Sequence, residues 1–156
     1  MESAGEQFFE TTPFHAISRM LEQWLVGQGE APRNIERLER ALGSAGLSLN
    51  EAVPLVAEFL NLPLPDRYQE LLMAPEQKRR RLFATLAEWM FGGARPQPVV
   101  IVVEDLHWAD PSTLELIQIL LEQGASVPLL LLCSARPEFR APWPMRAHHA
   151  QLALNG

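Results

Sequence analysis

The chain contains little of several residue types, and each scarcity argues against a class of protein. Its 156 residues include one cysteine, Cys133, so no disulfide framework is expected, and we expect a buried strand thiol in a reducing compartment. No signal peptide is visible and no apolar run approaches the roughly 20 residues of a membrane helix, which predicts a cytoplasmic protein without membrane contact. With 13 basic against 19 acidic residues and a net charge of −6, direct nucleic-acid binding is not expected.

The residues that are abundant indicate a globular domain whose first part is helical. Hydrophobic residues make up 47% and charged residues 21%, which is ordinary globular usage for one core. Apolar residues at helical spacing, capping residues, prolines and glycines predict four helices, over residues 14–25, 35–42, 48–60 and 75–92. Ser48 and Glu51 are spaced as a capping box, and residues 63–65 read as a linker. Short strands are predicted at 7–10 and 150–154.

The most informative pattern is the run Val99–Val103, which consists of β-branched residues alone. It predicts a parallel strand buried on both faces. Glu104 and Asp105 follow it directly, so the strand would deliver two carboxylates to the carboxyl edge of the sheet, where open α/β folds bind ligands. This is the pattern of a Walker B strand, which in nucleotide hydrolases holds one carboxylate near Mg²⁺ and a second group near the attacking water.

The residues after this strand extend the pattern. Asp110 followed by Pro111 predicts a helix N-cap and a first helical position, and an apolar stripe follows. A second apolar run, residues 128–133, precedes Arg136. If the two strands are parallel, Arg136 reaches the same sheet edge as the acids, where phosphate charge would need neutralising.

These residues resemble a known family. The pieces EDLHWADPSTLEL, SARPEF, APW and HHAQLALN look like signal-transduction ATPases of the STAND type, which are AAA-like, in the branch fused to adenylate or guanylate cyclases, bacterial kinases and transcription regulators. Upstream, EAVPLVAEFLNLPLPDRY and APEQKRRRLFATLAEWM look like the same branch. The resemblance implies an α/β fold: a partial P-loop NTPase (AAA-like) parallel sheet with a helical insertion. Residues 1–156 would form one incomplete domain, with a helical region at 13–94 and a core from Walker B to the sensor strand at 97–156.

The resemblance also implies ligands and residue roles. The intact module would bind ATP and Mg²⁺, hydrolyse ATP slowly and use the nucleotide as a conformational switch for an output domain. Glu104 and Asp105 would be catalytic, with Glu104 holding Mg²⁺, and Arg136, Asp110 and His107 would bind nucleotide. Many P-loop enzymes place Asp before Glu, whereas Glu104 precedes Asp105 here, so rapid turnover is not expected.

A phosphate-binding loop is absent from these residues. The pattern G-x-x-x-x-G-K-[ST] does not occur, and the single lysine, Lys78, lies in a basic run without a glycine loop before it. We therefore expect an N-terminally incomplete module, inactive alone, whose partners are a P-loop segment and an output domain in a longer protein.

Other interpretations of the same residues stay open at this stage. The two acids alternatively form a solvated strand end, and Arg136 a surface salt bridge with Glu138. We expect Asp110 to be an N-cap first and a functional group second, and Trp108 to be a packing anchor at the edge of the site rather than a base-stacking platform. A third interpretation makes Glu104, Asp105, His107 and Asp110 the ligands of a metal-dependent hydrolase. The alternative function from a different class is a non-catalytic interaction or scaffold fragment that binds no nucleotide.

Overall fold

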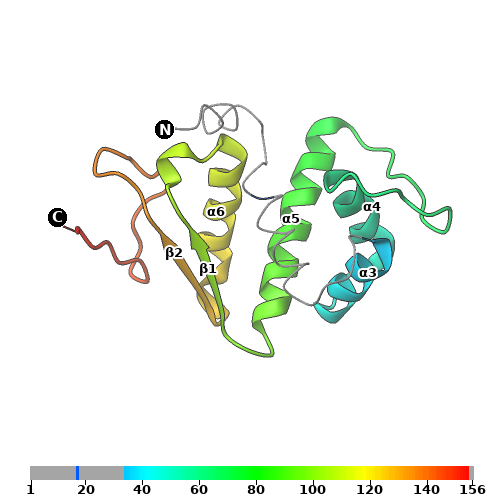
Figure 1. The fold of residues 1–156 in the computed structure, drawn as a ribbon, viewed down its shortest axis with the longest axis horizontal. Coiled ribbons are helices and arrows are strands. Elements are labelled where there is room, and N and C mark those ends of the chain that lie inside the picture. The colour runs from blue at the N-terminus through cyan, green and yellow to red at the C-terminus, as the bar shows by residue number, and fades with distance from the viewer. Residues whose placement is uncertain (1–16, 18–33, 155–156) are drawn as a thin grey trace, which may run out of the picture.

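The computed structural model describes Ile17 and residues 34–154. In chain order the elements are α3 (Ile35–Ser44), α4 (Leu49–Phe59), α5 (Pro75–Ala94), β1 (Val99–Val103), η1 (Leu106–Trp108), α6 (Pro111–Gln123), η2 (Gly124–Ser126) and β2 (Leu129–Cys133). Helix α5 stands between two groups of elements, with α3 and α4 on one side and α6 with the two strands on the other (Figure 1). The predicted strand at 7–10 and nearly all of the predicted helix at 14–25 lie outside the described residues.

The helices α3 and α4 confirm two of the predicted helices. Asn34 caps α3 by accepting a hydrogen bond from the backbone N–H of Arg37 at 2.9 Å, and α3 is followed by Gly46, whose φ of +83° is the left-handed conformation that glycine adopts at low cost. The expected capping box of α4 is wrong, because the Ser48 side chain makes no cap hydrogen bond. Its carbonyl instead accepts the Ala52 N–H at 2.9 Å.

Helix α5 contributes the largest side chains of the core. Pro75 opens it, as predicted, because a proline at the first position has no N–H to leave unpaired. The predicted apolar face is buried: Leu82, Phe83, Leu86, Trp89 and Met90. The helix continues through Gly92 and Gly93 to Ala94. Gly92 lies against Ala45, the residue that follows α3, and an added Cβ would come within 2.3 Å of the Ala45 carbonyl oxygen.

The strands β1 and β2 form a parallel pair in the register Val99↔Leu129 to Val103↔Cys133, with α6 in the connection between them. Both strands confirm the predictions, but burial on both faces is wrong. The exposed fractions of Val100 and Val102 are 56% and 60%, and Leu130 and Leu132 beside them are exposed as well. The physical reason is that α6 lies along one face only, on the side of the strands that faces α5 in Figure 1.

Two further expectations for the last third of the chain are also wrong. Cys133 is exposed, because it ends β2 where the sheet is no longer covered. Residues 150–154 form no strand, and Leu152 and Leu154 are 85% and 93% exposed. A strand requires a neighbour for its backbone hydrogen bonds, and the two strands of the described sheet pair only with each other.

Within Ile17 and residues 34–154, no helix combines the length and the apolar character needed to cross a membrane.

Candidate functional site

The carboxyl edge of the sheet, where β1 and β2 end, is held together by Ser134. Its backbone N–H donates to the carbonyl of Val103 at 3.0 Å, and its carbonyl accepts the N–H of Leu106 at 2.8 Å. Its hydroxyl oxygen accepts the N–H of Asp105 at 2.9 Å. The segment that carries the acids is therefore fixed to the segment that leads to Arg136. Sequence reasoning missed Ser134, although a hydroxyl directly after an apolar run was the available signal.

Asp105 occupies an unusual backbone conformation at this edge. Its φ and ψ are 56° and 49°, the left-handed region that side-chain-bearing residues rarely adopt, although aspartate tolerates it better than most. This conformation turns the chain from β1 into η1. Glu104 is exposed and the Asp105 side chain is 69% exposed, so both predicted carboxylates are open to solvent.

His107 lies within the η1 turn rather than on its surface. Its side chain is only 12% exposed, and Nδ1 is 3.9 Å from Oδ1 of Asp105, too long for a hydrogen bond. Neither ring nitrogen has a hydrogen-bond partner in the described part of the chain. Its ring centroid is 5.1 Å from that of Trp108. The nucleotide-binding role predicted for His107 stays a prediction. In the structure its ring packs beside that of Trp108 within η1.

Asp110 is the N-cap of α6, as predicted. Its Oδ1 accepts the backbone N–H groups of Ser112 and Thr113 at 3.0 and 3.1 Å. Its Oδ2 accepts the hydroxyl of Thr113 at 2.6 Å. The residue is 7% exposed, so its carboxylate is largely committed to the start of α6.

Trp108 and Arg136 contact each other across the edge. Trp108 is half exposed and its ring lies beside that of His107, so its role as a packing anchor at the edge of the site stays a prediction. The guanidinium carbon of Arg136 lies over the Trp108 ring, 5.5 Å from its centroid. No ion pair joins Arg136 to a carboxylate among the described residues, so the alternative of a salt bridge to Glu138 is not formed. The cation of the site therefore rests on an aromatic ring.

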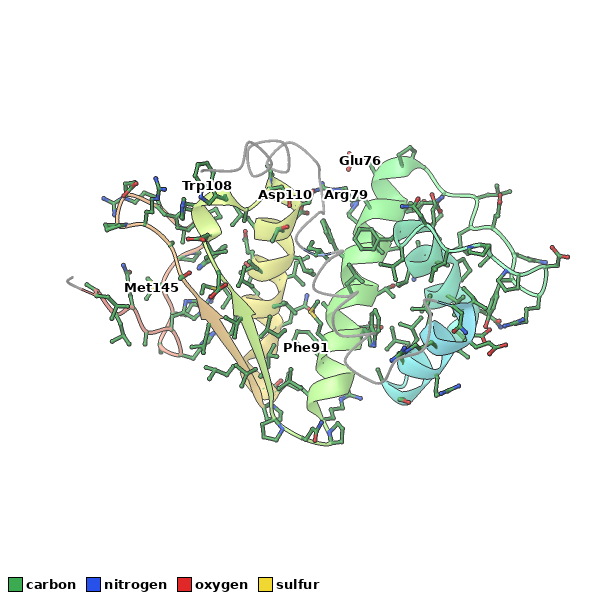
Figure 2. All side chains as sticks on the ribbon, viewed as in Figure 1. Glu76, Arg79, Phe91, Trp108, Asp110 and Met145 are labelled. Atoms are coloured by element: carbon green, nitrogen blue, oxygen red, sulfur yellow. The ribbon has the colours of Figure 1, made fainter. Side chains whose placement is uncertain are left out.

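A contact that sequence reasoning missed links α5 to the first turns of α6. Arg79 forms an ion pair with Glu115 at 2.6 Å and donates to the hydroxyl of Ser112 at 3.3 Å. Its guanidinium also lies over the Phe83 ring. Figure 2 shows Arg79 and Asp110 at the neighbouring N-terminal ends of α5 and α6. The helical part of the chain thus contacts the helix that follows the two acids.

The residues at the edge suit Mg²⁺ better than they suit a triphosphate. Mg²⁺ is commonly held through one or two carboxylates together with water and phosphate oxygens, and Glu104 offers such a donor. A triphosphate needs several cationic and N–H donors. Arg136 is available at this edge, whereas Lys78 is paired with Glu58 at 2.8 Å on the helical side. The described residues therefore fit Mg²⁺ in donor chemistry and do not form a phosphate cradle by themselves.

The metal-hydrolase alternative finds no support in the geometry. No group of three or more His, Cys, Asp or Glu side chains in the described part of the chain is arranged to hold a metal ion. Asp110 is committed to capping α6, and His149 lies in a turn in which its N–H donates to the carbonyl of Arg146 at 2.9 Å. The four acidic and histidine side chains within 104–110 thus do not converge.

Comparison with known proteins identifies the family. A family model described as "AAA ATPase domain" matches residues 2–132, and the chain therefore belongs to this family. The match includes β1, both acids and α6, and it stops before Arg136. An uncharacterized protein of Rhizobium meliloti (strain 1021) is 31% identical over 80 residues, which are 51% of this chain and 8% of that protein. The chain thus spans about 8% of the length of this curated relative. No solved structure matches.

Proposed function

We propose that this chain supplies the Walker B segment and the adjoining helical part of a STAND-type regulatory ATPase module. The observation that carries the proposal is the edge fixed by Ser134, which brings Glu104 and Asp105 to the same end of a parallel strand pair as Arg136. Membership of the AAA ATPase domain family supports ATP as the ligand. Bound Mg²⁺·ATP would supply an electrophilic γ-phosphate whose charge needs neutralising.

Each charged residue then has a distinct task. Glu104 binds Mg²⁺ through its exposed carboxylate, commonly by way of water. Asp105 orients water and accepts a proton from it, a task that suits a carboxylate held by a fixed backbone turn. Arg136 donates to the terminal phosphate, where its charge distinguishes ATP from ADP. Slow hydrolysis follows from the shorter reach of Asp105, and the bound state then acts as a switch for an output domain.

The switch needs a phosphate-binding loop that is not among these 156 residues. Two features support the view that further sequence completes the site. The apolar sheet face formed by Val100, Val102, Leu130 and Leu132 is exposed, which a folded module would cover. The relative from Rhizobium meliloti is also far longer than this chain. The alternative function, a scaffold without nucleotide, predicts that added P-loop sequence confers no binding.

The ion pair between Arg79 and Glu115 supports the switch in particular. It joins α5 to α6, and α6 begins only a few residues after the acids. If the Walker B segment moves on nucleotide binding, the Arg79–Glu115 ion pair would therefore transmit the displacement from α6 to α5. This coupling is part of the proposal. Arg79→Ala removes the ion pair and is tested in the experiment described next.

The test uses this sequence preceded by a strand, a G-x-x-x-x-G-K-[ST] loop and a helix, called here the P-loop-carrying protein. Glu104→Gln should weaken Mg²⁺-dependent ATP binding and hydrolysis together, whereas Asp105→Asn should leave binding nearly intact and abolish hydrolysis. Arg136→Ala should reduce the preference for ATP over ADP more than total nucleotide affinity. Glu122→Gln is the matched control, because Glu122 lies at the far end of α6. If the three site substitutions have effects as small as that of the Glu122→Gln control, the site assignment is removed.

A further inference from the structure

The contact between Trp108 and Arg136 joins residues that are distant in sequence. Trp108 ends η1 after the first strand, and Arg136 follows the second strand. They meet because β1 and β2 are parallel neighbours and because Ser134 bonds both to Val103 and to Leu106. The position of the tryptophan relative to the arginine is therefore set by the same backbone hydrogen bonds that fix the acids.

The backbone of Arg136 is also restrained. The N–H of Phe139 donates to the carbonyl of Arg136 at 3.0 Å, which closes a turn with Pro137 at its second position. Proline also disfavours helical backbone angles in the residue before it. What stays free in such a turn is the side chain, and an arginine side chain has many rotamers. Among the residues that the structure describes, the Trp108 ring is the contact that limits them.

An aromatic partner has a consequence that a carboxylate partner would not have. A carboxylate neutralises the guanidinium and occupies its N–H groups. An indole face attracts the cation through its quadrupole while the charge remains, and a guanidinium over a ring keeps N–H donors for an anion. Among the described residues Arg136 has no carboxylate partner, so it stays available for a phosphate.

The ring itself is supported from the protein side. The His107 ring, mostly buried, lies 5.1 Å from the Trp108 ring at an angle of 44°. Half of Trp108 nevertheless remains exposed, which is unusual for a large aromatic side chain whose only task is core packing. Its exposed position beside Arg136, the predicted phosphate-binding residue, is explained if the ring holds the guanidinium in place.

We propose that Trp108 is a positioning residue that holds the guanidinium of Arg136 at the carboxyl edge, charged and with free donors, before an anionic ligand arrives. The inference rests on the proposed function for the task of Arg136, but the contact itself can be measured without nucleotide. A cation–π contact at an exposed site changes a population by about two- to fivefold. Trp108→Leu should lower the ratio of positioned to unpositioned Arg136 by that factor, and Trp108→Phe should restore part of it.

The experiment is NMR spectroscopy of the ¹⁵N-labelled 156-residue chain, with the Nε–Hε signal of Arg136 assigned by its disappearance in Arg136→Lys. We expect ring-current-shifted Arg136 signals and a restrained Nε–Hε in the wild type, and in Trp108→Leu a loss of the ring-current shift with Nε–Hε values moved toward those of free arginine. Trp143→Leu is the matched control and should leave Arg136 unchanged. If Trp108→Leu does not fold, the indole N–H signal of Trp108 should still shift in Arg136→Ala.

Several results would overturn the proposal: free-arginine values in the wild type, an unchanged Arg136 signal in folded Trp108→Leu, or an equal loss in Trp143→Leu. In the P-loop-carrying protein, Trp108→Leu should also reduce the preference for ATP over ADP about two- to fivefold, with Trp108→Phe intermediate. Restrained Arg136 signals in a P-loop-carrying protein that binds no ATP would refute the proposed function and leave the positioning role standing.

Discussion

Replacing Asp110 by alanine should destabilise the fold through the start of α6. The substitution removes the acceptor of two backbone N–H groups, a loss of an N-cap that costs about 1 kcal/mol, within a range of about 0.5–2 kcal/mol. It also leaves the hydroxyl of Thr113, a residue only 4% exposed, without its acceptor. An unsatisfied buried polar group costs about 1–3 kcal/mol. The free energy of unfolding should therefore fall by about 2–4 kcal/mol.

Asp110→Asn is the matched control for this substitution. Its side-chain oxygen still accepts the two N–H groups. The amide nitrogen that replaces Oδ2 no longer accepts the Thr113 O–H but can donate to that hydroxyl oxygen, so the buried group keeps a partner. The loss is therefore chiefly the interaction between the carboxylate and the helix dipole, about 0.3–1 kcal/mol, and Asp110→Asn should be clearly less destabilising than Asp110→Ala. Urea unfolding followed by circular dichroism measures both variants, and an unchanged m-value shows that the folded and unfolded states are comparable. An unfolding free energy for Asp110→Ala within about 0.5 kcal/mol of the wild type would refute the capping argument.

Two further predictions concern the helical part. Gly92→Ala should destabilise the chain by about 1–3 kcal/mol, since its Cβ would meet the backbone of Ala45 at 2.3 Å, whereas Gly43→Ala, with 3.9 Å to the nearest atom, should be neutral or stabilising in the same denaturation assay. The hydrogen bond from Tyr68 to Glu39 is the main cause that lowers the pKa of that carboxyl, with Arg67 second. Its stabilisation is therefore present above the unfolded pKa near 4.5 and is lost as pH falls through the lowered value. Glu39→Gln should differ most from wild type at neutral pH and converge with it in acid; a difference that grows in acid would contradict this.

Local patterns predicted the elements of the fold well. The run Val99–Val103, the Asp110-Pro111 pair and the apolar spacing after Pro75 each depend on neighbouring residues, and each element formed as expected. Burial depends instead on what covers an element. The sequence of β1 suits burial on both faces, yet burial of its outer face requires a segment that no local pattern can locate.

The candidate site was predictable as a set of charges but not as a set of contacts. The order of strand, acids, helix and strand implied that Glu104, Asp105 and Arg136 reach one edge, because parallel strands end together. The ring contact of Arg136 and the hydroxyl bond of Ser134 depend on side-chain directions after the strands end, where no periodicity applies. Nor could sequence reasoning pair Arg79 with Glu115, since their contact joins two helices.

The central claim is that this chain is the Walker B part of an ATP-binding module and lacks the phosphate cradle. Isothermal titration of Mg²⁺·ATP into the 156-residue chain and into the P-loop-carrying protein tests it most directly. We predict no saturable binding at micromolar concentrations to the chain alone, since Glu104 and Asp105 repel the triphosphate and Arg136 is the cation at that edge. The P-loop-carrying protein should bind with a dissociation constant of about 1–10 μM or tighter. Tight binding by the chain alone, or none by the P-loop-carrying protein, would contradict the account.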